Sequence, residues 1–538
     1  MKSRSTMVVE IMDTTLRDGE QTSGVSFARQ EKLSIARLLL EDLKIPRIEI
    51  ASARVSTGEY EMAKQLCEWA EKRGHIDKIE ILGFLDKGAS IEWIRSCGAK
   101  VMNLLCKGSE KHCTFQLQKT VQEHVEDIKQ TIKKAKEVGL KINLYLEDWS
   151  NGIQHSPQYV FHLMDALKNE AVERFMLPDT LGILNPLQTL KFCRAMRRRY
   201  PDLRFDFHAH NDYDLATANT FAATLTGIQG VHCTVNGLGE RAGNAPLTSV
   251  VAVLHDHVKA TTGITENMVN KVSRIVESYS GIRVAANKPI IGESVFTQCA
   301  GVHADGDNKN NLYYNDLLPE RFGRKREYAL GKTSGRADAL HQALFLFGAV
   351  SKTSGRANIR KNLESLGIEL DDESIKRVTQ RVVELSDKKE MVTPEDLPYI
   401  ISDVLKHETI AQHVKVINYT LNLSQGLKPV AIIAIEVNGK TYEGASTGDG
   451  QYDAFVKAIR KIYKEQLGRT FPSLTNYTVN IPPGGHTDAL VQTVISWDYN
   501  GNILKTQGLD ADQMEAAIQA TIKMLNLIED KELNIQDN

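Results

Sequence analysis

The chain has 538 residues, which is too long for one hydrophobic core and predicts two or three domains. Apolar residues make up 42% of it and charged residues 25%, the ordinary range of a globular protein. Its 66 basic and 68 acidic residues give a net charge of -2, which argues against a broad nucleic-acid-binding surface.

The cysteines and the apolar segments indicate the cellular compartment. Seven cysteines are scattered without a CxxC pair, which favours buried thiols in a reducing compartment over a disulfide framework. The first 13 residues lack the apolar segment of a signal peptide, and no apolar run approaches the length of a membrane span. The sequence therefore predicts a soluble cytoplasmic protein without a membrane partner.

From residue 7 to about 255, short apolar strands alternate with amphipathic helices. Helices are expected over segments such as 31–41, 121–138 and 157–169. Eight βα units in about 250 residues predict a closed (β/α)8 TIM barrel, with catalytic groups at the C-terminal ends of the strands. A doubly wound open sheet is the alternative, and it would need fewer strands. The strands are expected at residues 8–12, 47–51, 79–83, 101–105, 142–147, 174–179, 204–210 and 230–236.

The first strand continues directly into a loop that gathers Asp13, Arg17, Asp18 and Glu20. One carboxylate and one guanidinium alone are as readily a structural ion pair as a binding site. The later strands, however, also end in polar groups. This repetition favours a ligand site at the mouth of the barrel.

The seventh strand carries His208 and His210 two residues apart, and therefore on one face. They could be two core histidines, but Asn211 and Asp212 extend the polar cluster instead of an apolar run. With Asp18 they form a set of oxygen and nitrogen ligands that suits Mn²⁺, Zn²⁺ or Mg²⁺.

Further strand ends contribute other groups to the predicted mouth. The glycine-rich loop 236–244 can bring backbone close to a ligand, although as a phosphate loop it is a weak motif alone. The fifth strand supplies polar groups from Asn143, Tyr145 and Glu147, and the sixth strand is followed by Thr180. The third and fourth strands add two apolar side chains, Leu82 and Leu105.

The last portion, about 412–532, contains an internal repeat that opens at 418–422 and again at 476–480. Each copy continues through further strands and closes with a helix, at 452–465 and at 512–525, which predicts two ββ(β)α units. Glycine-bearing turns are expected at 446–450 and 507–508, where free backbone N–H groups could hold a small carboxylate.

The segments DTTLRDGEQ, HAHND, NGLGERAGN and GVHADG together resemble the family of α-isopropylmalate, homocitrate and citramalate synthases, over nearly the whole chain. The segments EIASARVS, NLYLEDWSNG and IPPGGHTDALV are most similar to the citramalate synthases within that family. The resemblance implies an aldol-type condensation of acetyl-CoA with a 2-keto acid, followed by thioester hydrolysis. Pyruvate is favoured over 2-ketoisovalerate as the keto acid.

The resemblance also implies roles for individual residues. The metal ligands would be Asp18, His208 and His210, with Asn244 as a further, weaker one. Arg17 would steady the keto oxygen, Thr180 would bind the keto-acid carboxylate and Glu147 would be an active-site acid. The apolar pocket beside the keto carbon would consist of Leu82, Leu105 and Tyr145.

A segment beyond the barrel matches a family segment that leaves one subunit and covers the barrel mouth of its partner. It would bring His303 and Tyr313 to the acetyl-CoA, which requires a homodimer. Without the resemblance, His303 is a lone loop histidine. In the family the C-terminal domain binds a branched-chain amino acid, for which isoleucine is favoured here and leucine is the alternative.

These observations divide the chain into a catalytic barrel at 1–290, linker subdomains at 291–410 with a lid segment at 299–325, and a regulatory domain at 411–538. One departure from the family pattern is that KTSGRA at 332–337 recurs at 352–357, and the intervening 338–351 predicts an extra helix. A non-catalytic amino-acid sensor on an inactive barrel is the alternative from another class. It is disfavoured because Arg17, Asp18, His208 and His210 are all present.

Overall fold

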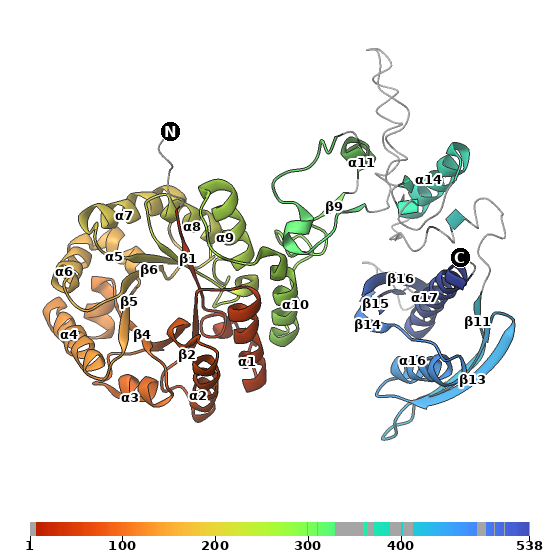
Figure 1. Cartoon of the computed structure of the whole chain (residues 1–538), viewed down its shortest axis with the longest axis horizontal. Coiled ribbons are helices and arrows are strands. Elements are labelled where there is room, and N and C mark those ends of the chain that lie inside the picture. Colours follow the sequence, from red (N-terminus) through yellow and green to blue (C-terminus); the bar gives the residue numbers. More distant parts are fainter. Residues whose placement is uncertain are drawn as a thin grey trace, which may run out of the picture. The chain divides into compact units, whose positions relative to one another are not determined.

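The computed structural model describes residues 7–298, 300–308, 310–328, 359–360, 362–363, 370–387, 397, 400–401, 413–480, 491–499, 501–510 and 512–536. The chain divides into two compact units. The first consists of Met1–Phe296 and Tyr314–Arg326, and the second of Thr297–Tyr313 and Glu327–Asn538. Figure 1 labels their helices and strands.

The first unit is a closed barrel of eight parallel strands, in which β8 pairs with β1. The predicted TIM barrel is therefore confirmed, and the open-sheet alternative is wrong. The strands are β1 (Glu10–Asp13), β2 (Arg47–Ser52), β3 (Ile79–Gly83), β4 (Val101–Lys107), β5 (Lys141–Glu147), β6 (Arg174–Asp179), β7 (Phe205–Ala209) and β8 (Gly230–Cys233).

Helices surround the barrel (Figure 1). Several begin where the sequence supplies a cap: Thr120 and Glu123 form a capping box, in which the Glu123 N–H donates to Thr120 Oγ1 at 3.3 Å and the Thr120 N–H donates to Glu123 Oε2 at 2.8 Å. The helices are α1 (Arg29–Arg37), α2 (Thr57–Lys72), α3 (Ala89–Ser96), α4 (Val121–Glu137), α5 (Trp149–His155), α6 (Pro157–Leu167), α7 (Pro186–Arg199), α8 (Ala216–Thr224), α9 (Leu247–Val253) and α10 (Val269–Ser280).

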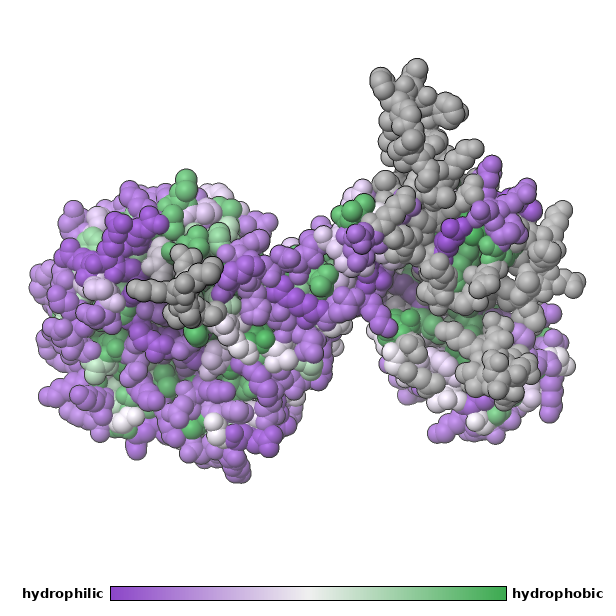
Figure 2. Space-filling model, turned by 45° about the horizontal axis from the view of Figure 1, so that its top comes forward, coloured by the Kyte–Doolittle hydropathy of each residue, from purple (hydrophilic) through white to green (hydrophobic). Residues whose placement is uncertain are grey.

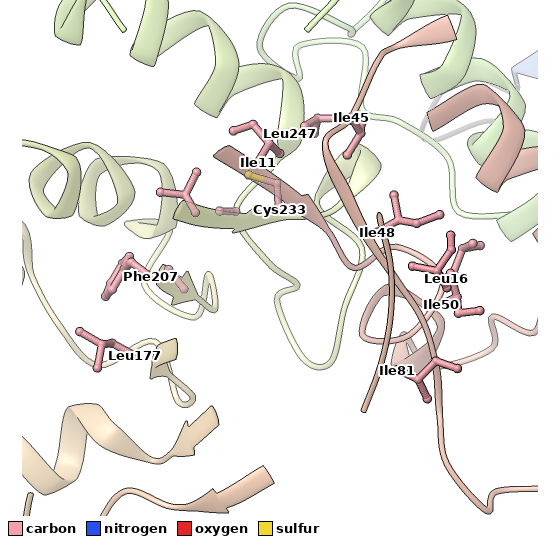
Figure 3. Packing of buried hydrophobic residues seen from close by; sticks show 14 of the residues in the cluster. Ile11, Leu16, Ile45, Ile48, Ile50, Ile81, Leu177, Phe207, Cys233 and Leu247 are labelled. Carbon is pink, nitrogen blue, oxygen red and sulfur yellow. The ribbon is translucent and has the colours of Figure 1, made fainter. Parts of the chain in front are cut away.

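The two faces of the barrel strands differ in chemistry. The outward face is apolar and buried, because alternate residues of each strand pack beneath the helices; Figure 3 shows this packing for Ile11, Ile48, Ile50, Ile81, Leu177 and Phe207. The inward face carries charge. Arg47 on β2 reaches Asp206 on β7, and since these strands are not neighbours, the contact crosses the barrel interior.

The inward charges form a layer in which every member has a partner. Arg47 donates from Nε to Glu80 Oε1 at 2.5 Å and from Nη1 to Asp206 Oδ2 at 2.6 Å. Arg174 Nη1 donates to Asp206 Oδ1 at 3.1 Å. A Cβ at Gly230 would lie 2.0 Å from that oxygen, so this glycine leaves room for the carboxylate. Branched apolar side chains usually fill this level of such barrels, so the charged layer is unusual.

The second unit contains two successive βββα repeats. The first consists of β11 (Val414–Asn422), β12 (Val430–Val437), β13 (Lys440–Thr447) and α16 (Gln451–Lys461), and the second of β14 (Ser473–Asn480), β15 (Val491–Tyr499), β16 (Asn502–Asp510) and α17 (Gln513–Gln536). Both opening strands shift register at the same point, between Val416 and Asn418 and between Leu474 and Asn476. The predicted internal repeat is thus confirmed.

The core of this repeat domain is apolar, with contributions from both copies such as Ile433, Phe455, Ile459, Trp497 and Ile518. One predicted turn is wrong, because Gly508 lies within β16 instead of before the second helix. A Cβ at Gly508 would lie 1.9 Å from the carbonyl oxygen of Ala516. This glycine therefore serves the close packing of α17 on the sheet.

In the sequence between the barrel and the repeat domain, the described residues include β9 (Thr297–Gln298), α11 (Gly301–Asn308), a 3-10 helix (Pro319–Phe322), β10 (Glu327–Tyr328) and the longer α14 (Asp372–Asp387). The extra helix expected at 338–351 lies outside the described residues. No helix in the described ranges is both long enough and apolar enough to cross a bilayer. Figure 2 shows a largely hydrophilic surface with scattered apolar residues.

Candidate active site

The loop after β1 is a tight turn that presents two charged side chains. The Asp13 carboxylate accepts hydrogen bonds from Thr15 N at 2.9 Å and from Thr15 Oγ1 at 3.0 Å. The carbonyl oxygen of Thr14 accepts the backbone N–H groups of Arg17 at 3.2 Å and of Asp18 at 2.9 Å. The turn therefore fixes Arg17 and Asp18 next to each other at the C-terminal end of the strand.

Arg17 is held by three side chains. Its Nε donates to Glu49 Oε2 at 2.6 Å, and its Nη2 lies 2.6 Å from the same oxygen. Nη1 donates to Asp18 Oδ2 at 3.0 Å, and Nη2 donates to the Tyr145 hydroxyl at 3.4 Å. Burial alone would lower the pKa of Arg17, but Glu49 and Asp18 raise it above its ordinary value. Of the five guanidinium N–H groups, one on Nη1 has no partner among the described residues.

Asp18, His208 and His210 come together as the sequence predicts. All three are buried, and one ligand atom from each lies within 4.8 Å of the others. His208 Nε2 lies 3.5 Å from Asp18 Oδ2, and the two imidazole centroids are 5.0 Å apart. Asn244 lies beside them, because its Nδ2 donates to Asp18 Oδ1 at 3.0 Å.

The protonation and hydrogen bonding of this set fit a divalent cation. Burial lowers the pKa of both histidines, so their imidazoles are neutral at neutral pH, the form that binds metals. Burial alone would raise the pKa of Asp18, but the positive charge of Arg17 holds it below its ordinary value. Three buried atoms in this set have no hydrogen-bond partner among the described residues: His208 Nδ1, His210 Nδ1 and Asn244 Oδ1.

A small apolar cluster, separate from the main core, adjoins the metal set. We refer to it as the Tyr145 cluster; it consists of buried Met12, Leu82, Tyr145 and Met176, with half-buried Phe84 and Leu105 packed against them. The Arg17 guanidinium carbon lies 5.8 Å from the centre of the Tyr145 ring, and the Tyr145 and His208 rings are 6.2 Å apart. The structure thus brings the three predicted pocket residues together, beside the predicted arginine and metal ligands.

Thr180 follows β6 and is oriented by backbone contacts. Its Oγ1 accepts the backbone N–H of Asp148 at 2.9 Å, and its carbonyl oxygen accepts Arg241 Nη2 at 2.8 Å. Asp148 has a left-handed backbone with φ of 63°, a conformation that aspartate tolerates better than most residues. Within the described part of the chain the Thr180 hydroxyl hydrogen has no acceptor, so it can donate to a ligand carboxylate.

The predicted acid Glu147 forms an ion pair with Lys107 at the end of the neighbouring strand. The backbone N–H of Lys107 donates to His124 Nε2 at 3.0 Å. His124 belongs to α4, so this contact links the strand end to the outer helical layer.

His303 and Tyr313 belong to the second unit. Their rings are in contact, with centroids 4.3 Å apart, and His303 Nδ1 lies 3.2 Å from Gln298 Oε1. A Cβ at Gly306 would lie 2.3 Å from Tyr313 Cε2, so the glycine in the GVHADG segment lets the Tyr313 ring lie against α11. The prediction that both residues serve a partner's barrel stays a prediction.

Sequence reasoning missed the inward residues that support the site. Glu49 orients Arg17, Asn103 Nδ2 donates to Glu49 Oε1 at 2.8 Å, and His232 contacts the Tyr145 hydroxyl. The sequence does carry a signal for these residues, which is the alternation of polar and apolar side chains along a strand. Each of the three either lies two residues from another polar residue of its strand or stands between apolar residues.

The fold and the site define a TIM-barrel enzyme with a candidate divalent-metal site at the strand ends. Residues 8–276 match the HMGL-like family, residues 290–348 the homocitrate synthase post-HMGL domain-like family, and residues 391–529 the LeuA allosteric (dimerisation) domain.

Relatives align over almost the whole chain. An (R)-citramalate synthase of Methanocaldococcus jannaschii is 32% identical over 97% of this chain and 100% of its own length. A putative (R)-citramalate synthase of Methanopyrus kandleri is 32% identical over 96% of both chains. A 2-isopropylmalate synthase of M. jannaschii is 30% identical over 97% of this chain and 94% of its own.

The chain therefore belongs to the family of citramalate, isopropylmalate and homocitrate synthases, and it is an acyltransferase. Enzymes of this family use acetyl-CoA, a keto acid and a divalent metal ion, and an amino-acid effector acts through the LeuA domain.

Proposed function

We propose that the enzyme condenses acetyl-CoA with pyruvate and hydrolyses the thioester to give (R)-citramalate and CoA, in isoleucine biosynthesis. The relatives do not decide between keto acids, because citramalate and isopropylmalate synthases match at 32% and 30% identity. The observation that supports pyruvate is the Tyr145 cluster, with its bulky side chains beside Arg17.

Bulk beside the keto carbon selects by steric overlap. Pyruvate carries a methyl group there and 2-ketoisovalerate an isopropyl group. Leu82 and Tyr145 are at most 5% exposed, and Met12 and Met176 are fully buried, so the cluster has little freedom to retreat. Steric overlap with the isopropyl group therefore discriminates between the two keto acids more strongly than the small loss of binding free energy that pyruvate suffers in an underfilled pocket.

The side chains of the mouth suit the substrate's two polar ends. Thr180 would donate its hydroxyl hydrogen to the keto-acid carboxylate, and the uncommitted Nη1 hydrogen of Arg17 would donate to the keto oxygen, where negative charge develops. Asp18, His208 and His210, with Asn244, would hold the divalent ion, which polarises the keto carbonyl when bound.

The acetyl methyl must lose a proton, and His303 is the proposed base. Gln298 Oε1 is an acceptor, so the contact at 3.2 Å places the histidine hydrogen on Nδ1 and leaves the Nε2 lone pair free to take a proton. Tyr313 would orient this imidazole through ring contact. We propose that both act on the mouth of a partner subunit's barrel, and that Glu147 serves as an acid in the same mouth.

The repeat domain is proposed to bind the feedback effector, for which isoleucine is favoured and leucine is the alternative. The LeuA allosteric domain match and the confirmed repeat support this assignment. Isoleucine, leucine and valine should be compared as inhibitors of the full-length enzyme, and inhibition by leucine alone would contradict the isoleucine assignment.

The test of the reaction is thiol release from acetyl-CoA with pyruvate, 2-ketoisovalerate and 2-ketoglutarate side by side. Pyruvate should give the highest kcat/KM. Leu105→Ala should shift the kcat/KM ratio toward 2-ketoisovalerate by roughly 10- to 200-fold, whereas the volume-conserving Leu105→Ile should shift it little. If the wild type turns over 2-ketoisovalerate best, it is a 2-isopropylmalate synthase instead.

A further inference from the structure

His232 on β8 joins the charged layer inside the barrel to the Tyr145 cluster. Its Nδ1 lies 3.0 Å from the Tyr145 hydroxyl, and its Nε2 lies 3.2 Å from Asp206 Oδ2. The three residues come from β5, β7 and β8, and none is more than 3% exposed. They form a continuous hydrogen-bonded row that ends at Arg17, whose Nη2 donates to the Tyr145 oxygen at 3.4 Å.

The direction of each hydrogen bond in this row follows from its fixed end. Asp206 accepts hydrogen bonds from Arg47 at Oδ2 and from Arg174 at Oδ1, so it is an acceptor for His232 as well. In an imidazole that carries one hydrogen, this hydrogen therefore lies on Nε2, and Nδ1 is an acceptor. Tyr145 must then donate its O–H to Nδ1, which leaves the oxygen lone pairs for Arg17.

The opposite orientation of the hydroxyl would disturb Arg17. If the Tyr145 hydrogen pointed at Nη2, two donors would face each other in a buried site, and Arg17 would keep only the contacts with Glu49 and Asp18. Asp206 keeps two arginine partners without His232, so charge neutralisation does not require the histidine.

We propose that His232 is a positioning residue for the condensation, because it holds the Tyr145 hydroxyl in the orientation that fixes the Arg17 guanidinium. The proposal rests on the role of Arg17 in the proposed function, but not on which keto acid is used. Tyr145 thereby has two separable roles: its ring contributes bulk to the Tyr145 cluster, and its hydroxyl orients Arg17.

Two substitutions of His232 separate its two contacts. An asparagine amide can place an oxygen near the position of Nδ1 and retain the acceptor for Tyr145, whereas a glutamine amide reaches the position of Nε2 and retains the contact with Asp206. We expect His232→Asn to keep kcat within about threefold of the wild type, and His232→Gln to lower kcat about tenfold or more with KM values little changed. Equal losses, or a larger loss in His232→Asn, would overturn the proposal.

Tyr145→Phe removes the hydroxyl and keeps the ring. It should also lower kcat about tenfold without changing the ratio of kcat/KM between pyruvate and 2-ketoisovalerate. The double variant Tyr145→Phe/His232→Gln should be no slower than the slower single variant, because both remove one interaction. Losses that multiply, or an unchanged kcat in Tyr145→Phe, would show that the row does not position Arg17.

An unchanged kcat in Tyr145→Phe would overturn the proposal even if one of the two His232 variants does not fold. Thermal unfolding and Mn²⁺ binding should match the wild type in each variant used. The kinetics are measured with whichever keto acid the wild type prefers, so a preference for 2-ketoisovalerate would contradict the proposed function while leaving the test of His232 intact.

Discussion

The barrel interior and the core of the repeat domain are both buried, but they are built from different side chains. In the repeat domain, sheets and helices meet through apolar residues, and the buried acid Glu529 pairs with Arg469. In the barrel, a charged layer continues through His232 and Tyr145 to Arg17. The difference indicates that the barrel interior is organised around chemistry, whereas the core of the repeat domain is organised around packing.

Removal of a metal ligand tests this contrast most severely. His208→Ala should abolish metal-dependent turnover while leaving the unfolding temperature nearly unchanged, because His208 lies at a strand end and not in the packed outer layer. Activity is measured as thiol release after chelation and re-addition of Mn²⁺. Full activity in this variant would remove His208 from the metal set.

A mixing experiment tests whether the second unit completes the barrel of another subunit. Arg17→Ala and His303→Ala should each be nearly inactive, and mixing them under subunit exchange should restore about a quarter of wild-type activity, because half of the dimers would be hybrids with one complete site. Co-purification of an untagged subunit with an affinity-tagged one is the control for exchange. No recovery despite proven exchange would contradict action in trans.

Substitution inside the charged layer should affect stability strongly. Asp206→Ala leaves Arg47 and Arg174 buried without their shared carboxylate, which should cost about 3–5 kcal/mol of unfolding free energy. Asp449→Ala in the repeat domain removes an exposed partner of Lys428 and should change stability little. Urea titrations measure the unfolding free energy of both variants. Similar losses of unfolding free energy would show that the interior charges stabilise the fold no more than an exposed ion pair does.

The smallest expected effect is a pH dependence in the outer layer of the barrel. Burial lowers the pKa of His124 to about 4, so protonation favours the unfolded chain, whose histidine titrates near 6.5. The free energy of unfolding should have its full value above pH 6.5 and fall as the pH drops toward 4. At pH 5 it should be lower by about 2 kcal/mol.

His124→Gln keeps an acceptor for the Lys107 N–H but cannot titrate, so it is the matched control for this pH dependence. Unfolding by urea at pH 7.5 and pH 5, followed by tryptophan fluorescence, should show a smaller acid loss in the variant. Parallel losses in the two proteins would exclude His124 as the cause.

The sequence predicted the barrel well because the outward faces of the strands are apolar and separated by helical segments and turns. The metal set was also predictable, since His208 and His210 share a strand face and Asp18 follows another strand end. Alternation shows that Glu49, Asp206 and His232 share the inward face, but not which of them meet across the barrel. Register and closure decide that, and neither can be read from one strand at a time.

Gly230 determines how much substitution the barrel interior tolerates. The space beside its Cα is occupied by the Asp206 carboxylate, so even an alanine would contribute a methyl group where that oxygen lies. The displaced acid would leave two arginines and the imidazole of His232 without their common acceptor, and the disturbance would extend to Arg17 through Tyr145. Gly230→Ala at the base of the barrel would therefore lower activity by displacing Arg17 at the mouth, a residue that the added methyl group does not contact.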